Sequence, residues 1–278
     1  MIPPADTWFP LAAVGLVLWL AVAAWLYVLT DTIKTPADVT RRLNLPCLGQ
    51  VPPVRGDPHP LLASFNVPHD FGESFRSLRT ALMSTYPDAG TKRLVITSAQ
   101  PLDGKTMTAS NLAMALAYGG ARVLLIDANM RQPGLHRPLR LTNDRGLSQV
   151  LTGQARVRDV MQRTVNPNLL AITAGRTPAN PSELLASERM KTLLANLGHG
   201  AFDWILIDTP ALTVPDASIL SSSVGGVVYV IGAGRTRRRL AVRAIEGLHA
   251  GNPGSVSAVL NNAVVVRPKP DAPDALAW

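Results

Sequence analysis

The sequence predicts an α/β fold of three layers with a mostly parallel sheet, preceded by one transmembrane helix. From residue 67 onward, apolar and β-branched runs alternate with stretches of helical spacing, which is typical of strands covered by helices on both faces. Before that region, residues 9–29 form an apolar run without a charge. A chain of 278 residues with 47% apolar content is sufficient for one folded domain with additional segments, and a disordered chain is excluded.

The apolar run at 9–29 is predicted to span a membrane. As a helix it would extend about 31 Å, close to the hydrocarbon thickness of a bilayer, with Trp8 and Tyr27 near its ends where interfacial aromatic residues lie. A buried core helix is the alternative, whereas a signal peptide is disfavoured because residues 1–8 contain no Lys or Arg. Every basic residue follows Thr30, so the positive-inside rule places the rest of the chain in the cytoplasm.

The remaining chain divides into a cytoplasmic linker at 30–66, a folded domain at 67–266 and a disordered tail at 267–278. In the linker, helical spacing over 36–43 with Thr35 as N-cap predicts one short helix, and the prolines that follow exclude a long one. Within the folded domain, strands are expected at 93–99, 122–128, 168–174, 204–209, 226–232 and 255–261, and helices at 105–118, 182–197, 216–223 and 236–250.

Charge and cysteine content limit the possible functions. A net charge of +8 and a sequence pI of ≈ 10.2 indicate contact with phosphates, whether of a nucleotide, a nucleic acid or an anionic lipid. One cysteine excludes a disulfide framework and a multi-cysteine metal site. Nucleic acid is disfavoured because no aromatic residues interleave the arginines at 235–243, which form either a phosphate or neighbouring-subunit contact or a solvated helix face.

Residues 99–106, Ala-Gln-Pro-Leu-Asp-Gly-Lys-Thr, match the phosphate-binding loop and lie between an expected strand and an expected helix. This context indicates a P-loop NTPase that binds ATP and Mg²⁺, because backbone N–H groups and the helix N-terminus enclose the β-phosphate. Lys105 would reach the β- and γ-phosphates, and the Thr106 hydroxyl would face Mg²⁺. Leu102 departs from the pattern, since a glycine would ease the turn. The predicted nucleotide-binding residues are Asp103, Gly104, Lys105, Thr106, Met107 and Asn261.

Two expected strands end in aspartate, Asp127 and Asp208, at the sheet edge where ligands bind in open α/β folds. A buried acid is costly unless it meets a metal or a donor, so Asp208 is predicted to support Mg²⁺ together with Thr106. A strand-end aspartate that caps the next turn is the ordinary alternative for one such residue. Asn261 ends the last strand and is a candidate for an adenine contact or a turn, and Asp216 for a helix cap or an approach to Mg²⁺.

Separate motifs occur in a fixed order along the chain. The segments are 98–106, 125–133, 146–148, 180–185, 207–210 and, upstream, the Glu-x-x-Arg-x-x-Arg pattern at 73–79. Together they resemble the Walker A, A′ and B motifs and accessory motifs of bacterial tyrosine kinases (BY-kinases), which act in capsular and exopolysaccharide synthesis. The resemblance covers about residues 67–266.

This resemblance implies an enzyme that transfers phosphate from ATP to a protein tyrosine, giving ADP and phosphotyrosine. It implies Lys105, Asp127 and Asp208 as catalytic residues, with Asp127 as the base toward the acceptor tyrosine. The residues implied to pack protomers into a homo-oligomeric ring are Glu73, Arg76 and Arg79.

The segments 31–38 and 45–49 are similar to the stretch that follows the second membrane span of polysaccharide chain-length determinant proteins. The similarity implies a fusion that retains only that last span, a single-pass protein of the bacterial inner membrane with residues 1–8 in the periplasm. It also implies partners among chain-length determinant, polymerase or export proteins. Gln100 stands where partition and septum-site ATPases carry a signature lysine, which favours the kinase family.

Two departures from the family pattern favour an alternative function. Asn129 replaces the second acid of the Walker A′ motif, and an amide cannot take up a proton. The tail at 267–278 contains no tyrosine, whereas the family carries a C-terminal tyrosine cluster. The alternative is a non-catalytic ATP-binding scaffold, a pseudokinase or ATPase that gates polysaccharide assembly.

Overall fold

The computed structural model describes residues 8–264 apart from 58, 65, 88–89 and 252, without the side chains of 8–11, 24, 26–30 and 250. Both the predicted N-terminus at 1–8, except for residue 8, and the predicted tail at 267–278 therefore lie outside the described residues. Within them, the sheet has eight strands in the order β1-β8-β7-β2-β6-β3-β5-β4. The strands are β1 Cys47–Val51, β2 Lys92–Ser98, β3 Val123–Asp127, β4 Met161–Arg163, β5 Leu169–Ile172, β6 Trp204–Asp208, β7 Gly226–Gly232 and β8 Ser255–Asn261.

Adjacent strands run parallel except at one edge, where β4 pairs antiparallel with β5. This pattern confirms the predicted three-layer α/β fold with a mostly parallel sheet. The helices are α1 Trp8–Thr30, α2 Pro36–Leu43, α3 His69–Thr85, α4 Lys105–Tyr118, α5 His136–Leu139, α6 Leu147–Leu151, α7 Val157–Val160, α8 Pro181–Ala186, α9 Glu188–Leu197, α10 Asp216–Ser221 and α11 Arg238–Ala250.

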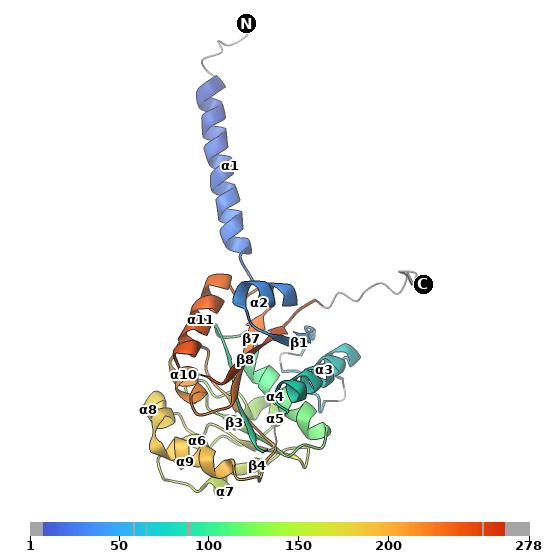
Figure 1. The fold of residues 1–278 in the computed structure, drawn as a ribbon, viewed down its shortest axis with the longest axis vertical. Coiled ribbons are helices and arrows are strands. Elements are labelled where there is room, and N and C mark those ends of the chain that lie inside the picture. The colour runs from blue at the N-terminus through green and yellow to red at the C-terminus, as the bar shows by residue number, and fades with distance from the viewer. Residues whose placement is uncertain (1–7, 58, 65, 88–89, 252, 265–278) are drawn as a thin grey trace, which may run out of the picture.

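Two hydrophobic clusters lie on opposite faces of the sheet. In β2, the buried side chains alternate between them: Leu94 and Ile96 join the cluster under α3 and α4, whereas Val95 joins the cluster under α2 and α8–α11. Figure 1 shows α3 and α4 on one side of the strands and α10 and α11 on the other. Alternation along a strand that is buried on both faces explains why the strand sequences read as continuous apolar runs.

The helix predicted at 9–29 forms as α1, which extends away from the sheet domain in Figure 1. Its described side chains include Val17, Trp19 and Trp25, each with about two thirds of its surface exposed. Within the described part of the chain, no helix is both long and apolar enough to cross a membrane. The predicted transmembrane span is therefore not confirmed.

The segment predicted as a linker, 30–66, contributes directly to the sheet. Its short helix is confirmed as α2, where Thr35 and Asp38 form reciprocal capping bonds. Its next residues form β1, an edge strand whose parallel partner is β8, with Cys47 opposite Ala258. The description of this whole segment as a linker is therefore wrong, because β1 completes the sheet.

The predicted helix at 182–197 is divided into α8 and α9. Ser187 between them has an extended backbone, and its hydroxyl accepts a hydrogen bond from the Met190 amide at the start of α9. Serine at an N-cap starts a new helix in this way, so one predicted element becomes two.

Candidate nucleotide-binding and catalytic site

The predicted phosphate loop connects β2 to α4. Gly104 ends it with φ = 94°, a left-handed conformation, and a Cβ at this position would lie 1.9 Å from Nδ2 of Asn261. Both facts require glycine here. Leu102 also has a positive φ, 68°, and its side chain is 72% exposed. A glycine would adopt this left-handed conformation without strain, whereas the Cβ of a leucine makes it unfavourable.

Asp103 stabilises the conformation of the loop through its hydrogen bonds. Its buried carboxylate accepts hydrogen bonds from the Gln100 backbone and side chain, and its carbonyl accepts one from Asn261 Nδ2 at 2.9 Å. Burial raises the pKa of Asp103, while hydrogen bonds from Thr236 and Gln100 oppose the rise. The Asp103 side chain therefore stabilises the loop, and the backbone N–H groups of the loop are the groups that would bind a phosphate.

Thr106 and Asp208 come together as predicted. The Thr106 hydroxyl donates to Oδ2 of Asp208 over 2.6 Å, and Oδ1 of Asp208 is buried without a hydrogen-bond partner among the described residues. Magnesium prefers hard oxygen ligands and is commonly held by one carboxylate, waters and substrate phosphates. A hydroxyl, a carboxylate and an unpartnered carboxylate oxygen beside a phosphate loop fit Mg²⁺.

Asp127 lies beside Asp208, because the two end neighbouring strands in register. Both oxygens of Asp127 accept backbone hydrogen bonds, Oδ1 from Asn129 and Oδ2 from Gly134 and Leu135. Burial raises the pKa of Asp127, and the Asp208 carboxylate raises it further. Burial also raises the pKa of Asp208, against the opposing charge of Lys105. Two neighbouring buried acids resist full ionisation until a cation or a proton compensates them.

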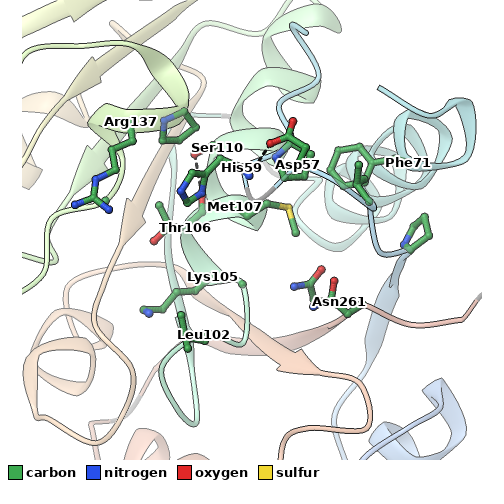
Figure 2. A pocket seen from close by; sticks show the side chains of 17 residues that line it. Asp57, His59, Phe71, Leu102, Lys105, Thr106, Met107, Ser110, Arg137 and Asn261 are labelled. Atoms are coloured by element: carbon green, nitrogen blue, oxygen red, sulfur yellow. Dashed lines mark hydrogen bonds between the residues drawn. The ribbon is translucent and has the colours of Figure 1, made fainter. Parts of the chain in front are cut away.

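A cavity of ≈ 410 Å³ lies above this loop and brings together most of the predicted nucleotide-binding residues. Figure 2 shows Lys105, Thr106 and Met107 from the start of α4, and Asn261 from the end of β8. The Asn261 amide donates to the loop, and its Oδ1 is buried without a partner among the described residues. Asn261 therefore positions the loop as well as lining the cavity.

The cavity is also lined by residues that the sequence analysis did not predict. Asp57 and His59, from the segment between β1 and α3, and Phe71, from α3, line it (Figure 2). Asn111 holds this segment against α4, since its Nδ2 donates to the Pro60 carbonyl and its Oδ1 accepts from the Leu62 amide. Asn111 precedes the apolar second half of α4, and a buried asparagine there needs hydrogen-bond partners, which was the signal that could have indicated the contact.

The Walker A′ asparagine serves the local turn. Asn129 Oδ1 accepts a hydrogen bond from the Gln132 amide, and the side chain is mostly buried. Nearby, the buried carboxylate of Asp216 pairs with Arg131 at 3.0 Å and accepts a hydrogen bond from the Ser182 hydroxyl. The capping role expected for Asp216 is wrong, because Asp216 is the first residue of α10, its N-cap position is Pro215, and no side-chain cap bond forms there.

The residues predicted for ring assembly lie on α3, outside this cavity. Arg76 pairs with Glu73 at 2.8 Å, and Arg79 donates to the Ala115 carbonyl near the end of α4. Both arginines line a second cavity, of ≈ 650 Å³, between α3 and α4.

Comparisons with known proteins agree with this geometry. A family model described as an AAA domain matches residues 95–231. Tyrosine-protein kinase YwqD of Bacillus subtilis is 38% identical over 68% of this chain and 80% of its own length. Tyrosine-protein kinase ptk of Acinetobacter johnsonii is 36% identical over 72% of this chain, which spans only 28% of that relative.

Solved structures give the same result. The BceF tyrosine kinase domain superposes with a TM-score of 0.75 at 34% identity, covering 84% of this chain and all of that domain. The chimerical protein CapA2B2 has a TM-score of 0.76 at 32% identity, with 83% and 100% covered. The septum site-determining protein MinD of Pyrococcus horikoshii, at 22% identity and a TM-score of 0.51, shares the fold alone. With its phosphate loop, paired strand-end acids and close relatives, the chain belongs to the bacterial tyrosine kinase (BY-kinase) family.

Proposed function

We propose that this chain is an ATP-dependent protein tyrosine kinase, attached to the bacterial inner membrane with its catalytic domain in the cytoplasm, which regulates capsule or exopolysaccharide synthesis and chain length. The observation that carries the kinase activity is the contact of Thr106 with Asp208 beneath the phosphate loop, next to Asp127. Membership of the kinase family supports the choice of tyrosine as acceptor.

Phosphoryl transfer depends on positioning and charge stabilisation. Lys105 and the N-terminal amides of α4 would hold the β- and γ-phosphates in the cavity. Magnesium, held by Thr106 and Asp208, would supply the charge that stabilises the departing phosphate oxygens. Asp127 would receive the proton of the acceptor hydroxyl, since its burial beside Asp208 favours the protonated carboxyl.

Lys105→Met in the full chain tests the kinase activity. Incubation with Mg-ATP and a glutamate–tyrosine copolymer is expected to give phosphotyrosine with the unaltered chain and none with the variant. Lys191→Met is the matched control, because Lys191 is an exposed lysine of α9 that pairs with Glu188 outside the cavity. Equal labelling by the Lys105→Met variant would refute the proposal.

A second function is favoured by Asn129, whose neutral side chain is used in the loop and not for proton transfer. In this function the chain binds ATP and acts as a scaffold that gates polysaccharide assembly. Binding of ATP without phosphotyrosine on the copolymer, on the chain itself or on a partner would support the scaffold. The Asn129→Asp variant then provides a direct check, because a catalytic defect caused by the missing acid should be reduced.

Membrane attachment is proposed through α1. The support is that its described apolar side chains, among them Leu16 and Leu20, are exposed and do not join either core cluster. Exposed apolar surface of this kind is stabilised by lipid. Fractionation of cells is expected to place the chain with inner membranes. Replacing Leu16 and Leu20 by arginine should move it to the soluble fraction, whereas valine at both positions should not.

Ring assembly and polysaccharide partners complete the proposal. Glu73 and Arg76 are exposed on α3, where charged side chains are available to a second copy. Arg76→Ala is expected to reduce the mass measured by sedimentation of the full chain, with Lys191→Ala as control.

A chain-length determinant, polymerase or export protein is the proposed partner, so Lys105→Met should alter the length of the cell's polysaccharide.

A further inference from the structure

The described tyrosines differ sharply in exposure. Tyr229 is fully buried in the sheet, and Tyr86 is half-buried with its hydroxyl hydrogen-bonded to Ser255 at 2.6 Å. Tyr118 is 57% exposed and has no hydrogen bond within the described residues. Tyr27 lies in α1, where its side chain is not described. Among the tyrosine hydroxyls that the structure describes, therefore, that of Tyr118 is the one free to enter another active site.

The surroundings of Tyr118 suit a phosphate. Tyr118 is the last residue of α4 and lines the ≈ 650 Å³ cavity together with Arg76 and Arg79. Arg79 is fixed at this end of α4, because it donates to the Ala115 carbonyl, and Ala115 lies one helical turn before Tyr118 on the same face. The guanidinium and the phenol are thus neighbours in one cavity. Phosphotyrosine carries about two negative charges, and paired arginines are its preferred partners.

The length of α4 determines which molecule must supply the phosphate. The helix begins at Lys105, where the γ-phosphate would be held, and ends at Tyr118. Thirteen residues of α-helix separate the two by roughly 20 Å, and a helix packed along its whole length does not bend back on itself. Tyr118 cannot reach the nucleotide of its own chain, so only a second copy can modify it.

We propose that Tyr118 is an acceptor of phosphate from a second copy of this chain, and that Arg76 and Arg79 hold the phosphate once it is attached. In this step the Tyr118 oxygen forms a bond to the γ-phosphorus of ATP bound to the other copy. The bond from that phosphorus to the β–γ bridging oxygen breaks, ADP leaves, and the phenolic proton passes to Asp127 of the other copy. The inference rests on the proposed kinase activity.

Phosphate on Tyr118 changes the charge balance between α3 and α4. Arg76 now pairs with Glu73, whose carboxylate carries one charge. A phosphate with about twice that charge competes for Arg76. The modification is therefore expected to break the Glu73–Arg76 pair, a contact on the helix proposed for ring assembly.

The test mixes two full-length chains of different tag mass, both treated with phosphatase beforehand. The unaltered chain is incubated with Mg-ATP and the Lys105→Met chain, and tyrosine phosphorylation on each is mapped by mass spectrometry. Phosphate on Tyr118 of the Lys105→Met chain is expected, with none when that chain is incubated alone. Tyr118→Phe should lose the label, and Tyr86→Phe, the matched control, should keep it.

A copolymer of glutamate and tyrosine, included as a separate substrate, distinguishes the two proposals. If the copolymer is phosphorylated but Tyr118 is not, or if only Tyr27 or Tyr86 is labelled, the inference on Tyr118 is overturned and the kinase activity stands. If neither is labelled, both are overturned. The role of the arginines has its own readout: a tyrosine phosphatase should remove the Tyr118 phosphate faster from the Arg76→Gln chain, and an unchanged rate would contradict that role.

Discussion

The Thr106 hydroxyl lies 2.6 Å from the Asp208 carboxylate and is its donor among the described residues. Thr106 lies in the first turn of α4 and Asp208 ends β6, so the contact joins the phosphate loop to the centre of the sheet. Thr106→Ala is expected to weaken Mg²⁺-dependent activity by about 10–100-fold, because a ligand and its orienting bond are both lost. Thr106→Ser keeps the hydroxyl and should retain most activity. Titration with Mg²⁺ at saturating ATP measures the difference.

Gly104→Ala is expected to remove nucleotide binding. The new Cβ would meet the Asn261 amide, and the left-handed backbone adds a further cost of about 1–2 kcal/mol, about tenfold in affinity by itself. Gly247→Ala is a suitable control, since Gly247 lies within α11 and a Cβ there meets nothing within 4 Å. A fluorescent ATP analogue measures binding. Normal affinity of Gly104→Ala would show that the loop relaxes away from Asn261.

Asp208→Asn should stabilise the metal-free protein while abolishing activity. Burial raises the pKa of Asp208, so the folded state favours the protonated acid. Stability is then greatest below the unfolded pKa, near 4, and decreases as pH rises toward the folded value. The neutral amide removes this decrease. Urea unfolding in EDTA should give the variant a free energy of unfolding higher than that of the unaltered chain by on the order of 1 kcal/mol at pH 8, and by less at pH 5. A variant that is less stable at both pH values contradicts this account.

Arg131→Met is expected to destabilise the fold by about 2 kcal/mol. It leaves the buried Asp216 carboxylate without its ion pair, although partial exposure of Arg131 moderates the loss. Adding Asp216→Asn to the same chain should recover part of the stability, because position 216 then carries no buried charge. Thermal unfolding of the two single variants and the double variant gives the coupling. Strict additivity would mean that the pair contributes nothing.

Local sequence was sufficient for much of the scaffold. The bounds predicted for α4, β7 and β8 match the structure, since a glycine or a polar residue ends each apolar run. The Thr35 N-cap was also predicted correctly, because the Asp38 amide that it accepts from lies within one turn. The strand-end position of Asp127 and Asp208 followed from the same runs.

Contacts between distant segments could not be read in this way. β1 has five residues, a preceding proline and Gly49 within it, and among the described strands it pairs only with β8. No local period reveals such a strand, because its stability comes from pairing across most of the chain. The Arg131–Asp216 pair and the use of Asn261 as a brace were missed for the same reason.

The position of β8 between β1 and β7 has a consequence for synthesis on the ribosome. The chain emerges from its N-terminus, so β1 appears early and has no strand to join until β8 follows, more than 200 residues later. Asn261, which holds the phosphate loop, arrives with that last strand. A nascent chain therefore carries the nucleotide motif long before Asn261 can hold the phosphate loop, and the sheet edge and the ATP site form together once β8 has been synthesised.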